Sequence, residues 1–221
     1  MWRTSILLDR AGVANGFGGV HQGDFRNAEL PPGVAIARQV HGSEVAKPIT
    51  EGRLSLEADG LLAGPLLGVG VLTADCIPIL LADPAARLFA AVHAGWRGTL
   101  KNVVKHAVQA LLLEGADLQR LRVAIGPCIR PCCYEVSEDL LSGFVKAFGS
   151  GVGRPGCRLD LAFANRQHLT SLGIPQANVD DLNECTRCAK NSDMYVYFSH
   201  RRSGDAAGRQ LSWVRGGGPL S

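Results

Sequence analysis

Three short segments of the chain combine a side chain suited to metal binding or nucleophilic attack with glycines and apolar neighbours. They contribute His41, Cys76 and His93, and they cover Arg38–Gly42, Thr73–Pro78 and Val92–Gly98. Two imidazoles and one thiolate can bind zinc, and three protein ligands leave a fourth position for water or substrate, as in catalytic zinc sites. A single histidine beside an apolar strand, or a single buried cysteine, is more often structural. The three residues together favour a catalytic metal site, although their scattered spacing does not establish one.

The same residues support two other interpretations. Without a metal, Cys76 would be a nucleophile and His93 its base, in a hydrolase that acts on amide-type bonds. Alternatively, zinc would only stabilise the fold of a non-catalytic regulatory protein. Metal analysis, and the presence of a coordination position open to water, would separate these interpretations.

The other cysteines form weaker patterns. Cys185 and Cys188 have the C-x-x-C spacing of a redox site or half a zinc site, but no second pair lies nearby in the sequence. Cys128, Cys132 and Cys133 follow a Gly-Pro turn, where we expect partly buried thiols that line or support the site. We therefore interpret the six cysteines other than Cys76 as ordinary thiols.

Strands must present the candidate residues at their ends. Residues from Leu66 to Ala82 are apolar at both odd and even positions, that is, on both faces of a strand. This pattern is typical of strands covered on both faces. Leu88–Val92 continues this pattern after an Asp-Pro turn, so we predict a central hairpin. Further short strands are predicted at Leu121–Ile125, Asn178–Leu182, Tyr195–Phe198 and Leu211–Val214.

Three helices are predicted between these strands. The first covers Leu100–Leu113 and ends before Gly115, the second follows Ser137 as N-cap and runs to about Phe148, and the third follows Asp160 and covers Leu161–Leu172. The glycine-rich stretch 149–156 is expected to be a loop and the tail 216–219 to be flexible. Strands mixed with helices predict an α/β or α+β fold, but periodicity does not determine the strand order.

Composition excludes several classes of protein. The chain has 221 residues, of which 46% are hydrophobic and 19% charged, so we expect one globular domain covering residues 1–221. A formal net charge of +3 gives no basis for nucleic-acid binding. The longest apolar stretch is interrupted by glycine and proline, which argues against a membrane helix. Seven cysteines without a secretory signal suggest the reducing cytoplasm.

Blocks of sequence along most of the chain resemble the YfiH-type family. This family was long described as multicopper polyphenol oxidases with a laccase domain, and is now described as purine nucleoside phosphorylases with adenosine deaminase activity. The blocks are RQVHGSEV (38–45), ADGLLAG (58–64), LTADCIPILLAD (72–83), AVHAGWRGTL (91–100), IGPCIRPCCYEV (125–136), DLAFANRQHL (160–169), CTRC (185–188) and YFSHRRSGDAAGRQLSWV (197–214). An ordered series of this length makes a chance match very improbable.

The resemblance implies a layered single domain in which mixed β-sheets are sandwiched between helices. It implies one catalytic zinc ion held by the positions that match His41, Cys76 and His93. The expected activity is phosphorolysis of adenosine, inosine, guanosine and methylthioadenosine to the free base and ribose-1-phosphate, together with deamination of adenosine. The expected partners are a purine nucleoside and phosphate, with no nucleic acid or membrane, for a cytoplasmic monomer or weak homo-oligomer.

Further roles follow from this chemistry. Zinc deaminases need a carboxylate that shuttles protons, and Asp75 is our candidate, although it could equally be a strand-end residue that accepts backbone hydrogen bonds. Phosphate requires cationic anchoring, for which Arg209 best matches the family's substrate arginine and Arg201 is the second choice. Trp96 and Phe17 could stack on a purine or pack within the wall.

Two features qualify the resemblance. The N-terminal region around residues 15–24 looks compressed and lacks the family's usual arginine, which leaves its contacts to base or ribose open. A multicopper oxidase needs additional histidines, commonly in His-x-His pairs, whereas this chain has six histidines and no such pair. A copper-dependent polyphenol oxidase is therefore disfavoured, although copper could occupy the zinc site in vitro.

Overall fold

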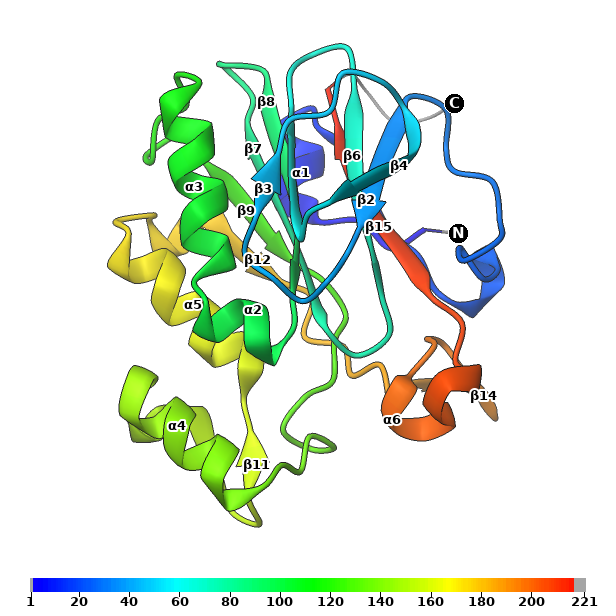
Figure 1. Cartoon of the computed structure of the whole chain (residues 1–221), viewed down its shortest axis with the longest axis vertical. Helices are drawn as coiled ribbons and strands as arrows, with labels where there is room; N and C mark the ends of the chain where they lie inside the picture. Colours follow the sequence, from blue (N-terminus) through cyan, green and yellow to red (C-terminus); the bar gives the residue numbers. More distant parts are fainter. Residues whose placement is uncertain (1, 217–221) are drawn as a thin grey trace.

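Two mixed β-sheets form the centre of the computed structural model, which describes residues 2–216 (Figure 1). The five-stranded sheet has the order β1-β15-β6-β2-β4, and the six-stranded sheet has the order β12-β9-β7-β8-β5-β3. Their strands are β1 (Ala14–Phe17), β2 (Val34–Arg38), β3 (Val45–Ala46), β4 (Gly52–Glu57), β5 (Gly60–Ala63), β6 (Gly68–Thr73), β7 (Ile77–Asp83), β8 (Leu88–Ala94), β9 (Arg122–Ile125), β12 (Val179–Asp181) and β15 (Gln210–Arg215). Two small ribbons pair β10 (Gly153–Arg154) with β11 (Arg158–Leu159) and β13 (Lys190–Asn191) with β14 (Met194–Tyr195).

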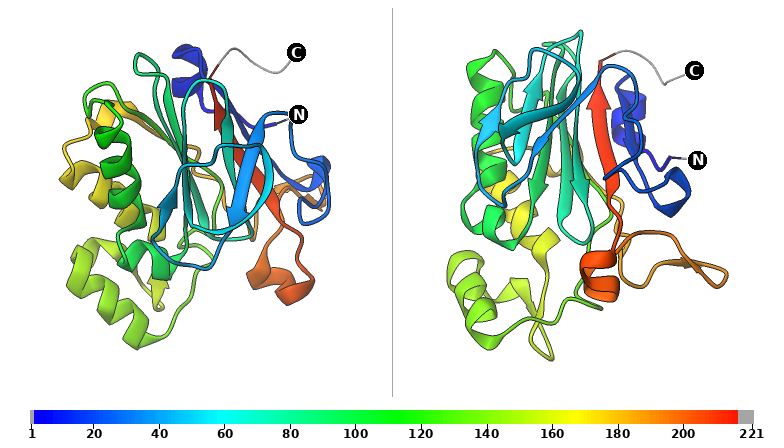
Figure 2. Two further views of the ribbon diagram at one scale, coloured as in Figure 1. Left: turned by 45° about the horizontal axis from the view of Figure 1, so that its top comes forward. Right: turned by 45° about the vertical axis from the view of Figure 1, so that its right-hand side comes forward.

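The helices at residues 103–113 and 161–171 lie on the outer side of the six-stranded sheet, and the helix at residues 138–148 lies below the end of that sheet. β15 and the N-terminal segment lie on the opposite side (Figure 2). The α-helices are α1 (Ile6–Arg10), α2 (Trp96–Leu100), α3 (Val103–Leu113), α4 (Glu138–Phe148), α5 (Leu161–Ser171) and α6 (His200–Ser203). Short 3-10 turns cover Val20–Gln22, Ser150–Val152, Gln176–Asn178 and Gly204–Ala206. This layered, mixed α/β arrangement confirms the predicted fold class.

The predicted hairpin is the antiparallel pair β7–β8. Its side chains alternate between two cores: Ile79 and Leu81 pack toward the helices, whereas Leu80 and Ala82 pack against the five-stranded sheet. All four side chains are fully buried. The apolar residues at both odd and even positions of 77–82 therefore reflect a strand covered on both faces.

Helix termini follow the capping residues that the sequence indicates. The Ser137 hydroxyl accepts a hydrogen bond from the Leu140 N–H, and the Asp160 carboxylate accepts one from the Phe163 N–H. Gly115, at φ +100°, follows the end of α3, and the Ala116 N–H returns to the Leu111 carbonyl in a Schellman arrangement. The boundaries of these helices were therefore predictable from local chemistry.

Three local predictions were wrong. The helix expected from Leu100 is divided, because Asn102 adopts a left-handed conformation (φ +61°) between α2 and α3. The strand expected at Tyr195–Phe198 ends at Tyr195, and the Gln210 side chain accepts a hydrogen bond from the Phe198 N–H where a neighbouring strand would have paired. The stretch 149–156 contains a 3-10 turn and β10 in place of a plain loop. Of the predicted flexible tail, residues 217–219 lie outside the described residues.

Candidate metal and substrate site

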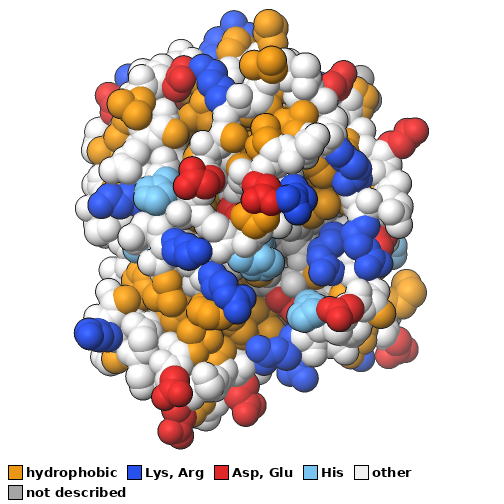
Figure 3. All heavy atoms as spheres, in the orientation of Figure 1, with side chains coloured by type: hydrophobic (Ala, Val, Ile, Leu, Met, Phe, Trp, Pro, Cys, Tyr) orange, Lys and Arg blue, Asp and Glu red, His pale blue; other side chains and the backbone are white. Residues whose placement is uncertain are grey.

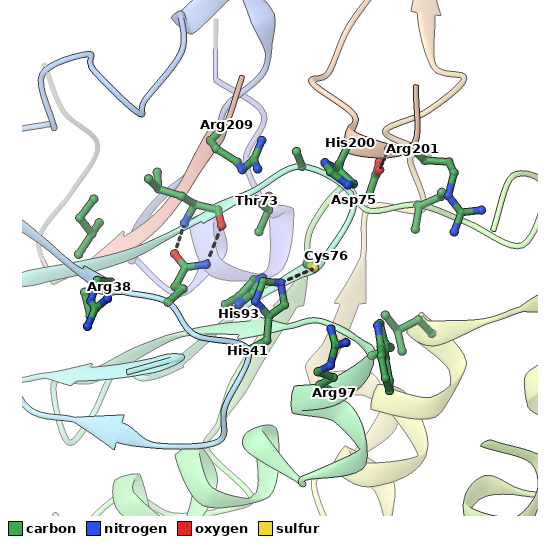
Figure 4. A pocket seen from close by; sticks show the side chains of 18 of the residues that line it. Arg38, His41, Thr73, Asp75, Cys76, His93, Arg97, His200, Arg201 and Arg209 are labelled. Atoms are coloured by element: carbon green, nitrogen blue, oxygen red, sulfur yellow. Dashed lines mark hydrogen bonds between the residues drawn. The ribbon is translucent and has the colours of Figure 1, made fainter. Parts of the chain in front are cut away.

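The three segments predicted to carry chemistry meet at the lower end of the two sheets in Figure 1, where β2, β7 and β8 begin or end. His41 follows β2, Cys76 lies in the turn that joins β6 of one sheet to β7 of the other, and His93 lies on β8. The possible ligand atoms of these three side chains lie within 4.8 Å of one another (Figure 4). Tertiary structure thus brings together the three residues that the sequence singled out.

A single buried carboxylate orients both histidines. Asp59, which precedes β5, lies 2.7 Å from His93 Nδ1 and also accepts hydrogen bonds from the backbone N–H groups of His41 and Gly42. An Asp59–His93 pair leaves Nε2 of His93 free to face the site, the arrangement that carboxylates impose on metal-binding histidines. Asp59 was not predicted as a site residue, although it lies within ADGLLAG and directly precedes an apolar strand.

The Cys76 side chain is poised as a thiolate. Burial raises its pKa, but His93 and His41 lower it through their charges and through hydrogen bonds to the sulfur. The effect of the two histidines is larger, and the pKa of Cys76 falls to about 6. Burial likewise opposes protonation of His93, yet Cys76 and Asp59 raise the pKa of His93 to about 9. Thiolates are the form in which cysteine binds metals or attacks substrates, so this pairing suits both the zinc and the nucleophile interpretations.

Backbone geometry makes room for the cluster. His41 adopts a left-handed conformation at φ +57°, which turns its ring toward Cys76, with its Nε2 4.0 Å from the sulfur. A Cβ atom on Gly95 would lie 2.9 Å from the Cys76 sulfur and 3.2 Å from a carbon of the His41 ring. Glycine is therefore required at position 95 for the two ligands to approach. Non-glycine residues with positive φ at a site store strain that surrounding contacts must support.

Asp75 is held by structural contacts. Its carboxylate is buried and accepts hydrogen bonds from the Thr186 hydroxyl at 2.6 Å, the Ser199 hydroxyl at 3.1 Å and the Arg201 backbone N–H at 2.6 Å. Asp75 also lines the pocket. These contacts favour the second of the two roles considered for Asp75, a carboxylate that anchors neighbouring backbone and side chains.

A pocket of about 710 Å³ opens beside the three ligand-type residues. Its wall includes the predicted Arg209 and Arg201 as well as Arg38 and Arg97, which lie around the cluster in Figure 4. Drawn as spheres, the molecule shows Lys and Arg side chains gathered across the middle of the face in Figure 3. A concave site with apolar walls and convergent cations suits an organic ligand that carries or meets an anion.

The aromatic candidates differ in position. Trp96 lines the pocket, with the Arg97 guanidinium 4.2 Å above its ring. Phe17 is 1% exposed and packs against Gly126 within the core, so it is not available for stacking on a ligand. Tyr134 and His200 also line the pocket and were not predicted, because neither has a spacing or flanking glycines that mark a site.

A second group of possible metal ligands lies outside the residues that line this pocket. Among residues 2–216, Cys132, Cys133, Cys185 and Cys188 place their sulfur atoms within 4.8 Å of one another and could hold a metal ion. The sequence analysis treated these residues as ordinary thiols and did not predict that four of them lie together. The two pairs are separated by about fifty residues in the chain, so spacing alone did not reveal their proximity.

None of the helices within residues 2–216 has both the length and the apolar character needed to cross a membrane. Both termini of the described chain lie near the five-stranded sheet, away from the three-residue cluster (Figure 1).

The fold and the site define a mixed α/β protein with a cationic pocket and a two-histidine, one-cysteine cluster, an arrangement typical of an enzyme. Residues 23–215 match the family model described as multi-copper polyphenol oxidoreductase laccase, and the chain belongs to this family.

The chain is similar to several enzymes. The chain is 40% identical over 187 residues to a purine nucleoside phosphorylase of Deinococcus radiodurans, covering 81% of this chain and 69% of the relative. It is 35% identical over 198 residues to adenosine deaminase RL5 from an unknown prokaryotic organism, covering 82% of this chain and 74% of the relative. The crystal structure of YlmD from Geobacillus stearothermophilus matches with a TM-score of 0.77 and 28% identity, over 94% of this chain and 93% of YlmD.

Proposed function

We propose that this chain is a zinc-dependent purine nucleoside phosphorylase that also deaminates adenosine. The observation that carries the proposal is the convergence of His41, Cys76 and His93 beside a pocket of about 710 Å³ lined by arginines. The names of the relatives, a purine nucleoside phosphorylase and an adenosine deaminase, support the same two activities. We further propose one domain over residues 1–221, a cytoplasmic location, and a monomer or weak homo-oligomer without nucleic-acid or membrane partners.

The donor set suits zinc. Two imidazole nitrogens and one thiolate leave one coordination position for water or substrate. The low pKa of Cys76, about 6, favours the thiolate at neutral pH, and Asp59 fixes the His93 ring. When bound, zinc would supply Lewis-acid polarisation of a substrate oxygen or activation of water.

The chain's own residues would bind and orient the substrates. In phosphorolysis, the C1′–N9 bond breaks, a C1′–O bond to phosphate forms, and the departing purine takes up a proton. Arg209 and Arg201, which line the pocket, would hold the phosphate, and Trp96 would contact the base. In deamination, water replaces the amino group at C6 and ammonia leaves. Adenosine, inosine, guanosine and methylthioadenosine are the proposed nucleosides.

The test uses purified protein with adenosine, with and without phosphate. Adenine and ribose-1-phosphate should form only with phosphate, whereas inosine should form without it. Cys76→Ser should lose both activities, and the matched control Cys157→Ser should keep them, because Cys157 lies in neither cysteine-containing cluster. Full rates in Cys76→Ser would contradict the proposal.

The lowered pKa of Cys76 also favours one alternative, the metal-free hydrolase in which His93 is the base. Chelation separates the two functions. Removal of zinc should abolish phosphorolysis, and its return should restore it. If the chelated protein keeps its full activity and an alkylating reagent at Cys76 abolishes it, the hydrolase is the better description.

A further inference from the structure

We propose that Cys132, Cys133, Cys185 and Cys188 bind a second zinc ion in a closed tetrahedral site whose role is to stabilise the wall of the substrate pocket. This site is distinct from the His41–Cys76–His93 cluster, and the inference does not depend on the proposed activity.

The distances between the sulfur atoms fit tetrahedral coordination. With a Zn–S distance of about 2.3 Å, neighbouring sulfurs of a regular tetrahedron lie about 3.8 Å apart. The Cys132 and Cys188 sulfurs are 3.7 Å apart, and all four lie within 4.8 Å of one another. All seven cysteines of the chain are free thiols rather than disulfide partners. The four sulfurs therefore surround a space of the right size for one ion.

The donor type selects the metal and the role. Four thiolates in a tetrahedral arrangement select zinc or an iron–sulfur centre over oxygen-preferring cations. Four protein ligands leave no position for substrate, which is typical of a structural site. Backbone N–H groups of Arg130, Cys188 and Arg187 donate hydrogen bonds to the Cys185 sulfur. Such backbone support to the sulfur is the outer-shell contact that stabilises a metal-bound thiolate.

The four cysteines join two segments that have little regular secondary structure. The Cys128 N–H donates to the Glu184 carbonyl and the Thr186 N–H donates to the Cys128 carbonyl, so the segments already run side by side. Arg130 forms a buried ion pair with Asp181 at the same junction. A metal ion bound to all four sulfurs would cross-link the two segments in addition to these contacts.

One connection from this junction to the substrate pocket runs through Thr186. Thr186 lies between Cys185 and Cys188, and its hydroxyl donates to the Asp75 carboxylate at 2.6 Å. Asp75 is adjacent to Cys76 and also accepts a hydrogen bond from the Arg201 backbone N–H. Loss of the proposed ion would loosen Thr186 first, and then the Asp75 contacts that position Arg201 in the pocket.

Metal analysis of protein purified under reducing conditions gives the first test. We expect two zinc ions per wild-type chain, and one in Cys188→Ser and in His41→Ala. The matched control Cys157→Ser should keep two. One zinc ion in the wild type, with no change in Cys188→Ser, would overturn the proposal, and so would iron or a Cys132–Cys188 disulfide at this position. Because the readout is metal content, it is independent of whether the chain phosphorolyses nucleosides.

Wild-type protein provides a second test that does not depend on the folding of a variant. The Cys132 and Cys188 side chains are exposed, so without a metal a thiol reagent should have access to them. We expect them to be protected in the purified protein and to become reactive once a colorimetric chelator has removed the zinc. Rapid reaction of both thiols before chelation would contradict the site. Reloading the chelated His41→Ala protein with Co²⁺ should give an intense thiolate-to-cobalt absorption.

Discussion

The two cysteine-containing clusters have different surroundings. His41, Cys76 and His93 stand at the ends of buried strands and face a pocket, whereas Cys132, Cys133, Cys185 and Cys188 lie in turns outside that pocket. The first has one sulfur and two nitrogens with a side open to substrate. The second has four sulfurs and no further position. Donor number and access, rather than the presence of cysteine, therefore distinguish a site suited to chemistry from one suited to structure.

The supports of the two clusters also differ. Strand register and the Asp59 carboxylate hold the first cluster, and His93 is only 3% exposed. The second lies in irregular segments that backbone hydrogen bonds and the Arg130–Asp181 ion pair join. The first should therefore keep its arrangement without metal, while the second should lose order. Four measurements sharpen this contrast, in order of decreasing effect.

The largest effect is expected when a residue of the first cluster is removed. His93→Ala should lower kcat/KM for adenosine phosphorolysis by roughly a thousandfold or more, because the proposed metal loses a ligand. Cys188→Ser should instead lower the melting temperature while its kcat changes by less than about tenfold. If Cys188→Ser were as inactive as His93→Ala and equally stable, the assigned roles would be reversed.

A smaller effect is expected from Asp59→Asn. The amide keeps the shape of the carboxylate but loses the charge that orients His93, so zinc affinity at the first cluster should fall by about 10–100-fold. A competition titration with a zinc chelator measures this. Asp83→Asn is the control, because Asp83 is an equally buried carboxylate paired with Arg120 far from the site. It should reduce stability and leave zinc affinity unchanged.

Gly95→Ala should act by steric overlap alone, since φ at Gly95 is −72° and any residue can adopt it. The new Cβ atom would press on the Cys76 sulfur, and we expect a loss of roughly tenfold in zinc affinity at the first cluster. Gly143→Ala has no atom within 4 Å of its new Cβ and lies within α4, so it should be neutral or slightly stabilising. Equal zinc affinity in both variants would argue against close packing at position 95.

The smallest effect concerns alkylation of the metal-free protein as a function of pH. Cys76, whose pKa is lowered to about 6, becomes a thiolate above that pH, so its alkylation should reach half its maximum near pH 6. Burial, and hydrogen bonds that the Cys188 thiol donates to Cys185 and Cys133, raise the pKa of Cys188 to about 11, so its half-maximum should lie far higher. At pH 8 only a small fraction of Cys188 is thiolate, but this thiolate is the more nucleophilic of the two because its pKa is higher. The two alkylation rates at pH 8 should therefore differ by less than about tenfold. Mass spectrometry of the two peptides measures both curves.

Local patterns predicted much of the fold. Ser137 and Asp160 mark helix N-termini because their side chains accept hydrogen bonds from backbone N–H groups of the first turn. Gly115 marks a helix C-terminus because glycine tolerates a positive φ. The β7–β8 hairpin was predictable from apolar residues on both alternations. Strand order was not, since β6 and β7 are neighbours in sequence but pair in different sheets.

The candidate site divides in the same way. Side-chain chemistry alone selected His41, Cys76 and His93, because imidazole and thiol groups are few and stand out among apolar strands and glycines. Asp59 became recognisable only in the fold, where the antiparallel pairing of β5 with β8 sets it beside His93. Phe17 looked available for stacking, and only its packing against Gly126 places it in the core.

The sequence by itself determined which atoms could bind a metal and where most helices begin, because both depend on residue type and on contacts within a few positions. Tertiary structure alone decided which donors meet. Cys132 and Cys133 join Cys185 and Cys188 because the parallel contact of Cys128 with Cys185 brings two distant turns together. Coordination depends on distances of a few ångströms between side chains, and only the folded chain sets those distances.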